Sequence, residues 1–150
     1  MMNRILFAWI VALAVLVAGS SVGVAADPAN THAGTNKKNR LVLQVSDNDP
    51  GKWNLALNNA SNIQKDVGAG NVDIEIVVYG PGIGMLKADS IAANRVNDVL
   101  AAGVKVVACE NTMQAQKLSK ADMMANVGYV SAGVVELMQR QQEGWAYIRP

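Results

Sequence analysis

Residues 72–109 read VDIEIVVYGPGIGMLKADSIAANRVNDVLAAGVKVVAC, and this stretch decides the fold. Its first part (VDIEIVVY) begins with alternating polarity and ends as a continuous apolar run, which is typical of a strand buried on both faces at its C-terminal half. Residues 90–102 then have apolar side chains at helical spacing and stop at Gly103. The expected inward face of this helix consists of Ile91, Val96, Val99 and Leu100. Residues 104–109 (VKVVAC) are again apolar and β-branched, so the stretch predicts two parallel strands joined by a crossover helix.

The sequence before this unit predicts one more strand and one more helix. Residues 40–45 (RLVLQV) form a short apolar run that a polar segment interrupts. Asp49 and Pro50 are a typical helix start, because the carboxylate accepts backbone N–H groups and proline suits the first helical position. Apolar residues then recur at spacings of three and four as far as Gly68, which indicates one amphipathic helix.

The sequence after the unit continues the alternation in shorter pieces. We expect a short helix over 111–118, a connector or second short helix over 119–126 and a brief extended piece over 127–130. A final helix is expected over 131–143, capped by Ser131, and a last strand over 145–148. The expected inward face of this final helix consists of Val134, Val135, Leu137 and Met138. These elements predict an α/β fold, a three-layer sandwich with a mostly parallel, doubly wound sheet of about 4–5 strands.

The composition excludes several classes of function. The chain has 150 residues, with 13 Lys and Arg against 12 Asp and Glu, one Cys and one His. This length suits one compact domain. The near-neutral charge disfavours nucleic acid as a partner, because binding to phosphates needs a basic surface. A single Cys excludes an internal disulfide and, with a single His, the usual zinc-ligand sets, so we expect no metal and no cofactor.

The N-terminal segment predicts export. An apolar run at residues 5–18, followed by small residues before the expected cleavage point, fits a secretory signal peptide over residues 1–26 that is cleaved after Ala26. An uncleaved anchor is the alternative, because the segment approaches the length of a membrane span. We expect a periplasmic or secreted protein without membrane attachment after cleavage. Residues 27–39 are polar and aperiodic and predict a disordered linker, which leaves residues 40–150 as the domain.

Two loops at expected strand ends hold candidate binding residues, because ligands of such folds bind at the carboxyl ends of the strands. The run of alternating glycines from Gly80 to Gly84 has Met85 at the position where a dinucleotide-binding loop requires its third glycine. It predicts a tight turn, or a backbone surface that a ligand or a neighbouring subunit approaches at Gly80 and Gly82. In the other loop, Asp47 is expected to bond its own turn, with acid–base chemistry or a cation as the alternative.

Cys109 is the candidate reactive residue. It ends an expected strand and directly precedes a helix expected to start near residues 110–112, so its sulfur should lie near several unpaired backbone N–H groups. Asn111 and Thr112 are candidate binding residues at this helix start. Such a position favours the thiolate and lowers the pKa of the thiol. The neighbouring carboxylate of Glu110 acts in the opposite direction, because its negative charge disfavours the thiolate. The alternative is a buried cysteine that serves as a small apolar side chain.

These residues resemble a known family. The stretch 102–113 (AGVKVVACENTM), together with residues 78–83 (VYGPGI), is similar to the DsrE/DsrF-like family, and the similarity covers about residues 40–150. The resemblance implies an α/β domain that assembles as homo-oligomers, either trimers or hexamers. It also implies a sulfur relay in which one cysteine carries a persulfide, and the matching position here is Cys109. The export signal departs from the sulfur-relay members, which are cytoplasmic.

Two functions follow as hypotheses. In the first, the exported protein is a sulfur carrier or sulfur-transfer accessory protein that uses Cys109 and works with a donor or acceptor protein. In the second, it is a non-catalytic periplasmic module that binds a small ligand or assembles into oligomers, and Cys109 is structural. The neutral charge and apolar positions expected on the surface, Trp145 and the pair Met123 and Met124, are compatible with self-association.

Overall fold

The sheet contains five strands, all parallel, in the order β4-β3-β2-β1-β5. The computed structural model describes residues 38–150. The strands are β1 (Asn39–Val45), β2 (Val72–Val78), β3 (Lys105–Cys109), β4 (Gly128–Val130) and β5 (Ala146–Ile148). The first four strands are added in one direction and β5 pairs on the free side of β1, which is the doubly wound arrangement expected from the sequence.

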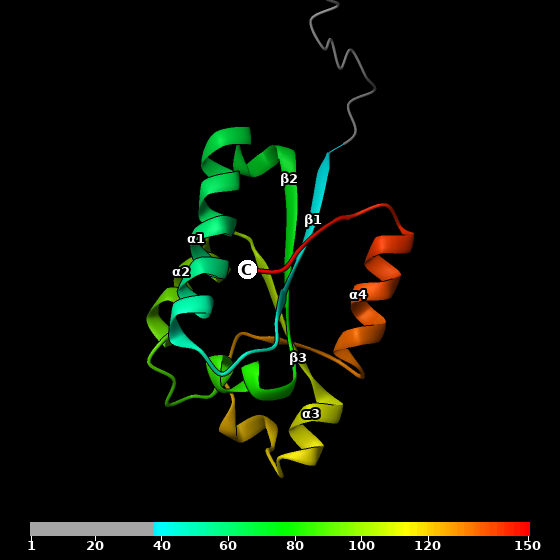
Figure 1. Cartoon of the computed structure of the whole chain (residues 1–150). Coiled ribbons are helices and arrows are strands. Elements are labelled where there is room, and N and C mark those ends of the chain that lie inside the picture. The colour runs from blue at the N-terminus through cyan, green and yellow to red at the C-terminus, as the bar shows by residue number, and fades with distance from the viewer. Residues whose placement is uncertain (1–37) are drawn as a thin grey trace, which may run out of the picture. The chain divides into compact units, whose positions relative to one another are not determined.

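The helices form the outer two layers of the sandwich. The α-helices are α1 (Pro50–Val67), α2 (Ala93–Ala101), α3 (Glu110–Ala115) and α4 (Gly133–Gln142). Shorter 3₁₀ helices are η1 (Ala69–Asn71), η2 (Gly80–Leu86) and η3 (Lys120–Asp122). Helices α1 and α2 lie on one side of the strands and α4 lies on the other, while α3 lies where β3 ends (Figure 1). The predicted three-layer α/β fold is therefore confirmed.

The core is unequal on the two faces of the sheet. The larger apolar cluster lies under α1 and α2 and includes Trp53, Leu57, Val96, Val99, Ile76 and Val106. The smaller cluster lies under α4 and consists of the buried residues Val42, Val77, Val107 and Leu137. Polar side chains therefore occupy much of the layer between α4 and the sheet.

The start and the end of α1 agree with the sequence. The Asp49 carboxylate accepts hydrogen bonds from the backbone N–H groups of Gly51 at 2.8 Å and Lys52 at 3.4 Å. Proline at residue 50 occupies the first turn. The helix ends at Gly68, whose φ of 87° lies in the left-handed region that glycine adopts without strain.

The packing of α4 differs from the expectation. The residue before the helix is Ala132, which makes no capping hydrogen bond, so Ser131 is not the cap. Val134, Val135 and Met138 are exposed. The helix instead turns Gly133, Leu137 and Arg140 toward the sheet, because a buried carboxylate on β2 pairs with the arginine.

Other apolar positions also differ from the expectation. Met123 and Met124 are buried, since the backbone N–H of Met124 bonds to the carbonyl of Leu86 and holds the segment against the core. Trp145 is half-buried. Ile91 precedes α2 and is 81% exposed, because the helix begins only at Ala93.

The expected signal peptide and most of the expected linker lie outside the described residues. Within residues 38–150, no helix is both long and apolar enough to cross a membrane.

Candidate functional site

Cys109 lies at the carboxyl end of β3, where it pairs with Val130 of β4. Val107, two residues earlier on the strand, packs in the cluster under α4, so Cys109 lies on the same face of the sheet. The residue is buried, with 4% of its surface exposed. Its sulfur lies 4.0 Å from the carbonyl oxygen of Ser131, in the segment that leads into α4.

Polar groups around the sulfur favour the thiolate. Burial raises the pKa of Cys109, but hydrogen bonds outweigh this effect. The groups that lower the pKa are the Thr112 hydroxyl and the backbone N–H groups of Gly133, Thr112 and Asn111, and the last of these also donates to the carbonyl oxygen of Ser131 at 3.1 Å. The pKa of Cys109 therefore lies below the ordinary value for a thiol, and the cause is hydrogen bonding to the charged form.

Thr112 links Cys109 to the loop that follows β2. Its Oγ1 accepts a hydrogen bond from the backbone N–H of Gly80 at 2.9 Å, so the hydroxyl hydrogen remains free to point at the sulfur. The side-chain amide of Gln116 donates to the carbonyl of Gly80 at 3.3 Å. Gly80 has a φ of 53°, a conformation that favours glycine. The structure thus places Gly80, Thr112 and Asn111 together at Cys109.

Gly82 and Asp47 have other surroundings. A Cβ on Gly82 would lie 2.7 Å from the carbonyl oxygen of Val45, so this glycine allows the loop after β2 to pack on the end of β1. The Asp47 carboxylate pairs with Lys52 at 3.2 Å and Arg149 at 3.3 Å. The hydrogen bond from Lys52 lowers the pKa of Asp47, with a smaller contribution from Arg149. Neither residue is among the hydrogen-bonding groups around the sulfur.

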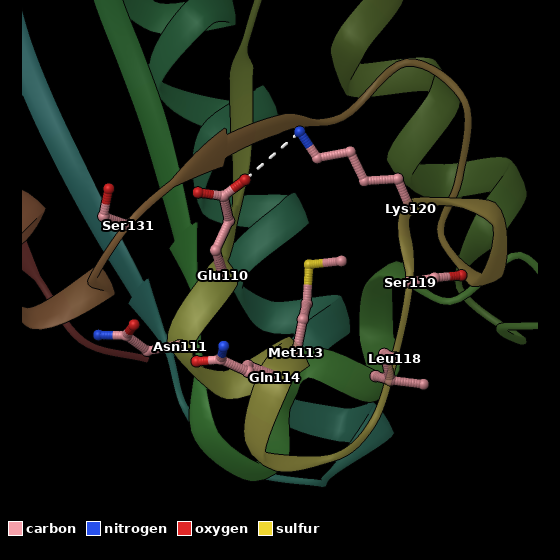
Figure 2. A pocket seen from close by; sticks show the side chains of 8 residues that line it. All are labelled: Glu110, Asn111, Met113, Gln114, Leu118, Ser119, Lys120 and Ser131. Atoms are coloured by element: carbon pink, nitrogen blue, oxygen red, sulfur yellow. Dashed lines mark ion pairs between the residues drawn. The ribbon is translucent and has the colours of Figure 1, made fainter.

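A pocket of about 490 Å³ (Figure 2) opens at residues 110 and 111, which directly follow the cysteine in the chain. It is lined by Glu110, Asn111, Met113, Gln114, Leu118, Ser119, Lys120 and Ser131. Lys120 Nζ pairs with Glu110 at 3.3 Å and lies 4.4 Å from the ring centre of Tyr129. A smaller pocket of about 290 Å³ shares Glu110 and Ser131 with the first. Cys109 lines neither pocket, although Glu110 follows it in the chain and the carbonyl of Ser131 contacts its sulfur.

Sequence reasoning missed Ser131 and Gly133 as neighbours of the sulfur. The signal that could have found them is the short extended piece at 127–130, whose carboxyl end belongs to the same edge of a parallel sheet as Cys109. Within residues 38–150, no group of three or more His, Cys, Asp or Glu side chains is arranged to hold a metal ion.

The fold and the cysteine define a class: parallel α/β domains with a thiol at the end of the third strand. Residues 39–150 match the DsrE/DsrF-like family, and the chain belongs to this family, which is a sulfur-relay family. Comparison with curated protein sequences gave no match.

Solved structures agree with this assignment. The protein MTH1491 from Methanobacterium thermoautotrophicum, described as of unknown function, is 35% identical, with a TM-score of 0.72 over 75% of this chain and 100% of that chain. BT1422 from Bacteroides thetaiotaomicron, also described as of unknown function, is 13% identical with a TM-score of 0.62, and the match covers 75% of this chain and 95% of that one. The ychN protein from E. coli is 12% identical with a TM-score of 0.61, over 75% and 99% of the two chains. The last two share the fold alone.

Proposed function

We propose that this protein is a sulfur carrier in which Cys109 holds a persulfide. The observation that carries the proposal is the set of hydrogen-bond donors around the sulfur, which come from Thr112, Asn111 and Gly133 and lower the pKa of the thiol. A thiolate is the form that attacks sulfur. Membership of a sulfur-relay family supports the same role.

The chemistry balances with a sulfane donor such as thiosulfate. The Cys109 thiolate attacks the outer sulfur of thiosulfate, an S–S bond forms to the cysteine, and the bond between the two donor sulfurs breaks. Sulfite leaves with the electron pair of that bond. The product is a persulfide anion, which the same N–H and hydroxyl donors stabilise and which a thiol of an acceptor protein then attacks.

Intact-mass spectrometry of the full chain tests this proposal. After incubation with thiosulfate or inorganic polysulfide, we expect the mass to rise by one sulfur atom, and we expect a reductant to reverse the change. Cys109→Ser is the control and should gain nothing. An adduct of equal yield in Cys109→Ser would refute the role of the cysteine.

The export and the assembly belong to the same proposal. The signal-like residues 1–26 support a mature protein that begins after Ala26 in the periplasm or outside the cell, and the mass of protein purified from a cell envelope fraction tests this. The exposed apolar side chains of Leu55, Val67 and Ile91 support a homo-oligomer, a trimer or a hexamer. Light scattering at micromolar concentration tests it, and a monomer would contradict it.

A second candidate is favoured by the burial of Cys109. A thiol in a residue that is 4% exposed, outside both neighbouring pockets, suits a structural cysteine in a non-catalytic binding or assembly module. This candidate predicts that the thiol resists labelling until the protein is denatured, and that Cys109→Ala keeps the physiological activity. The carrier predicts labelling in the folded state.

A further inference from the structure

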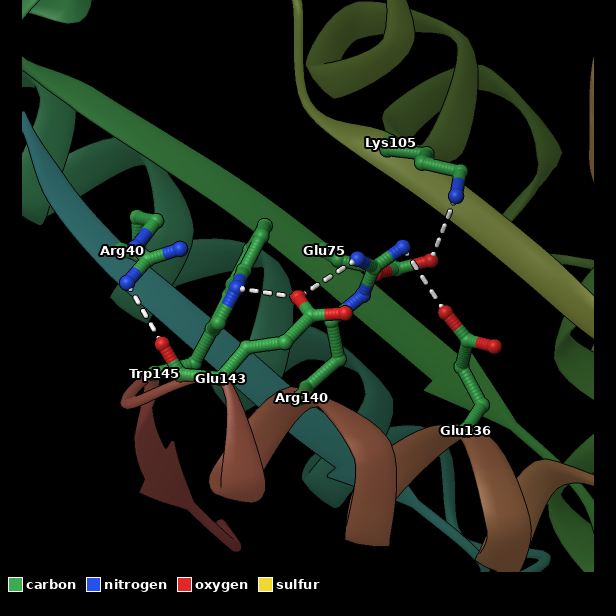
Figure 3. A network of polar contacts seen from close by, with 7 residues as sticks. All are labelled: Arg40, Glu75, Lys105, Glu136, Arg140, Glu143 and Trp145. Atoms are coloured by element: carbon green, nitrogen blue, oxygen red, sulfur yellow. Dashed lines mark hydrogen bonds and ion pairs between the residues drawn. The ribbon is translucent and has the colours of Figure 1, made fainter.

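Glu75 is a buried charge at the centre of the sheet. It lies on β2 and is 0% exposed, which is rare for a carboxylate unless it is paired. Its Oε2 accepts a hydrogen bond from Nε of Arg140 on α4, and its Oε1 pairs with Lys105 Nζ of β3 at 2.9 Å (Figure 3). The only buried, charged side chain of the described residues is therefore held by the helix above it.

Arg140 uses its whole guanidinium in this network. Besides Glu75, it pairs through Nη2 with Glu136 at 2.8 Å and through Nη1 with Glu143 at 3.1 Å. The guanidinium also lies 4.8 Å from the ring centre of Trp145. Burial lowers the pKa of Arg140, but the bond to Glu75 outweighs it, so the arginine remains charged.

Few apolar contacts hold α4 on the sheet. Its buried residues are Gly133 and Leu137, and its other large apolar side chains face solvent. Helix α1 by contrast buries Trp53, Leu57 and two alanines. Helix α4 therefore joins the sheet through a small apolar cluster around Leu137 together with the charge network.

The N-terminal end of α4 closes over Cys109. The carbonyl oxygen of Ser131 lies 4.0 Å from the sulfur, and the backbone N–H of Gly133 contributes to the lowered pKa of the thiol. Gly133 is packed so tightly on Tyr79 that a Cβ would lie 3.0 Å from the Cβ of that tyrosine. An attack on sulfane sulfur needs a donor in line with the thiolate, which a residue with 4% exposure does not permit.

We propose that α4 is a hinged cover for Cys109, latched by the buried pair of Glu75 and Arg140. The hinge is Gly144, whose φ of 82° follows the end of the helix, so that the N-terminal end of α4 moves away from the sulfur together with residues 131–133. Lifting the helix exposes the sulfur to a donor. The motion of α4 follows from its contacts alone, and only its role in admitting a sulfur donor rests on the proposed function.

A charge pair suits a latch that must both hold and release. The pair fixes one position of the helix, because a displaced arginine would leave Oε2 of the buried Glu75 without a partner and only Lys105 on Oε1. Full opening brings water to both groups, so their hydration offsets the loss of the contact. An apolar attachment of the same helix would lose its burial on opening without such compensation.

The test is the rate at which a small thiol reagent, iodoacetamide, labels Cys109 in the full folded chain. Glu75→Gln and Arg140→Met should raise the rate about tenfold, which corresponds to about 1.4 kcal/mol in the opening equilibrium. Well below the unfolding transition, the rate should rise with denaturant less steeply than global unfolding does, because lifting α4 exposes less surface. Leu137→Ala weakens the packing of α4 and leaves every buried charge paired, so it should also raise the labelling rate. This variant keeps the test decisive if Glu75→Gln and Arg140→Met fail to fold.

The matched control is Val96→Ala, which weakens α2 on the opposite face and should leave the labelling rate unchanged. Equal rates in the wild type, Glu75→Gln and Leu137→Ala would overturn the cover, and so would an equal increase in Val96→Ala. Sulfur uptake by the wild type with unchanged labelling in the variants would remove the cover and leave the carrier. Faster labelling of the variants without sulfur uptake by the wild type would refute the sulfur carrier and support the cover.

Discussion

Replacing Thr112 by valine tests how the surroundings of Cys109 control its charge. Valine has the shape of threonine but cannot donate a hydrogen bond. The thiolate therefore loses the hydroxyl that contributes most to lowering the pKa of Cys109. The backbone N–H of Gly80 also loses its acceptor. Thr112→Ser keeps the hydroxyl and is the matched control.

The size of the effect follows from the bond that is removed. Hydrogen bonds to charged groups contribute about 1.5–3 kcal/mol, and because Thr112 is half-buried we take the low end. A change of about 1.4 kcal/mol is a factor of ten in an equilibrium. Below the titration midpoint, Thr112→Val should therefore hold about ten times less thiolate than the wild type. The unpaired N–H of Gly80 should cost about 1–3 kcal/mol of stability as well.

The assay is the ultraviolet absorbance of the thiolate as a function of pH. Subtracting the curve of Cys109→Ser removes the absorbance of tryptophan and tyrosine. The titration should give a pKa below the ordinary thiol value in the wild type and in Thr112→Ser, and a higher pKa in Thr112→Val. Identical titration curves for the wild type and Thr112→Val would show that the hydroxyl does not stabilise the thiolate.

Three further predictions concern the loops and helix ends around the site. Gly82→Ala should destabilise the protein by about 1–3 kcal/mol in urea unfolding, because its Cβ would overlap the carbonyl of Val45, and an unchanged midpoint would contradict the packing. Asp49→Ala should cost about 1 kcal/mol and Asp49→Asn much less, since asparagine still caps α1; equal losses would exclude the cap. The lowered pKa of Asp47 stabilises the fold above about pH 4, and this stability is lost as the pH falls through the folded-state value. Asp47→Asn should therefore flatten the acid side of the stability profile, and a profile like that of the wild type would contradict the ion pairs.

Much of the fold could be predicted because local patterns carried it. The apolar runs that became β1, β2 and β3 were bounded by turn residues, and Asp49 began α1 through a contact with its own neighbours. Cys109 was identified because it ends a strand of a parallel sheet, and ligands of such folds bind at the carboxyl ends of the strands. These inferences needed no knowledge of distant contacts.

The surroundings of α4 could not be predicted in this way. Periodicity selected Val134, Val135 and Met138 as the inward side, because it ranks side chains by hydrophobicity alone. Glu75 reversed that choice, since a carboxylate buried on β2 must face a cation. The pairing of β3 with β4, which brings Gly133 to the sulfur, is likewise a contact between distant segments.

The most direct test of the central claim is the mass of the full chain after exposure to thiosulfate or polysulfide. The sulfur-carrier account predicts one added sulfur atom that a reductant removes, located on Cys109 and absent in Cys109→Ser. A wild-type chain that gains no sulfur, or a serine variant that gains as much, would contradict it.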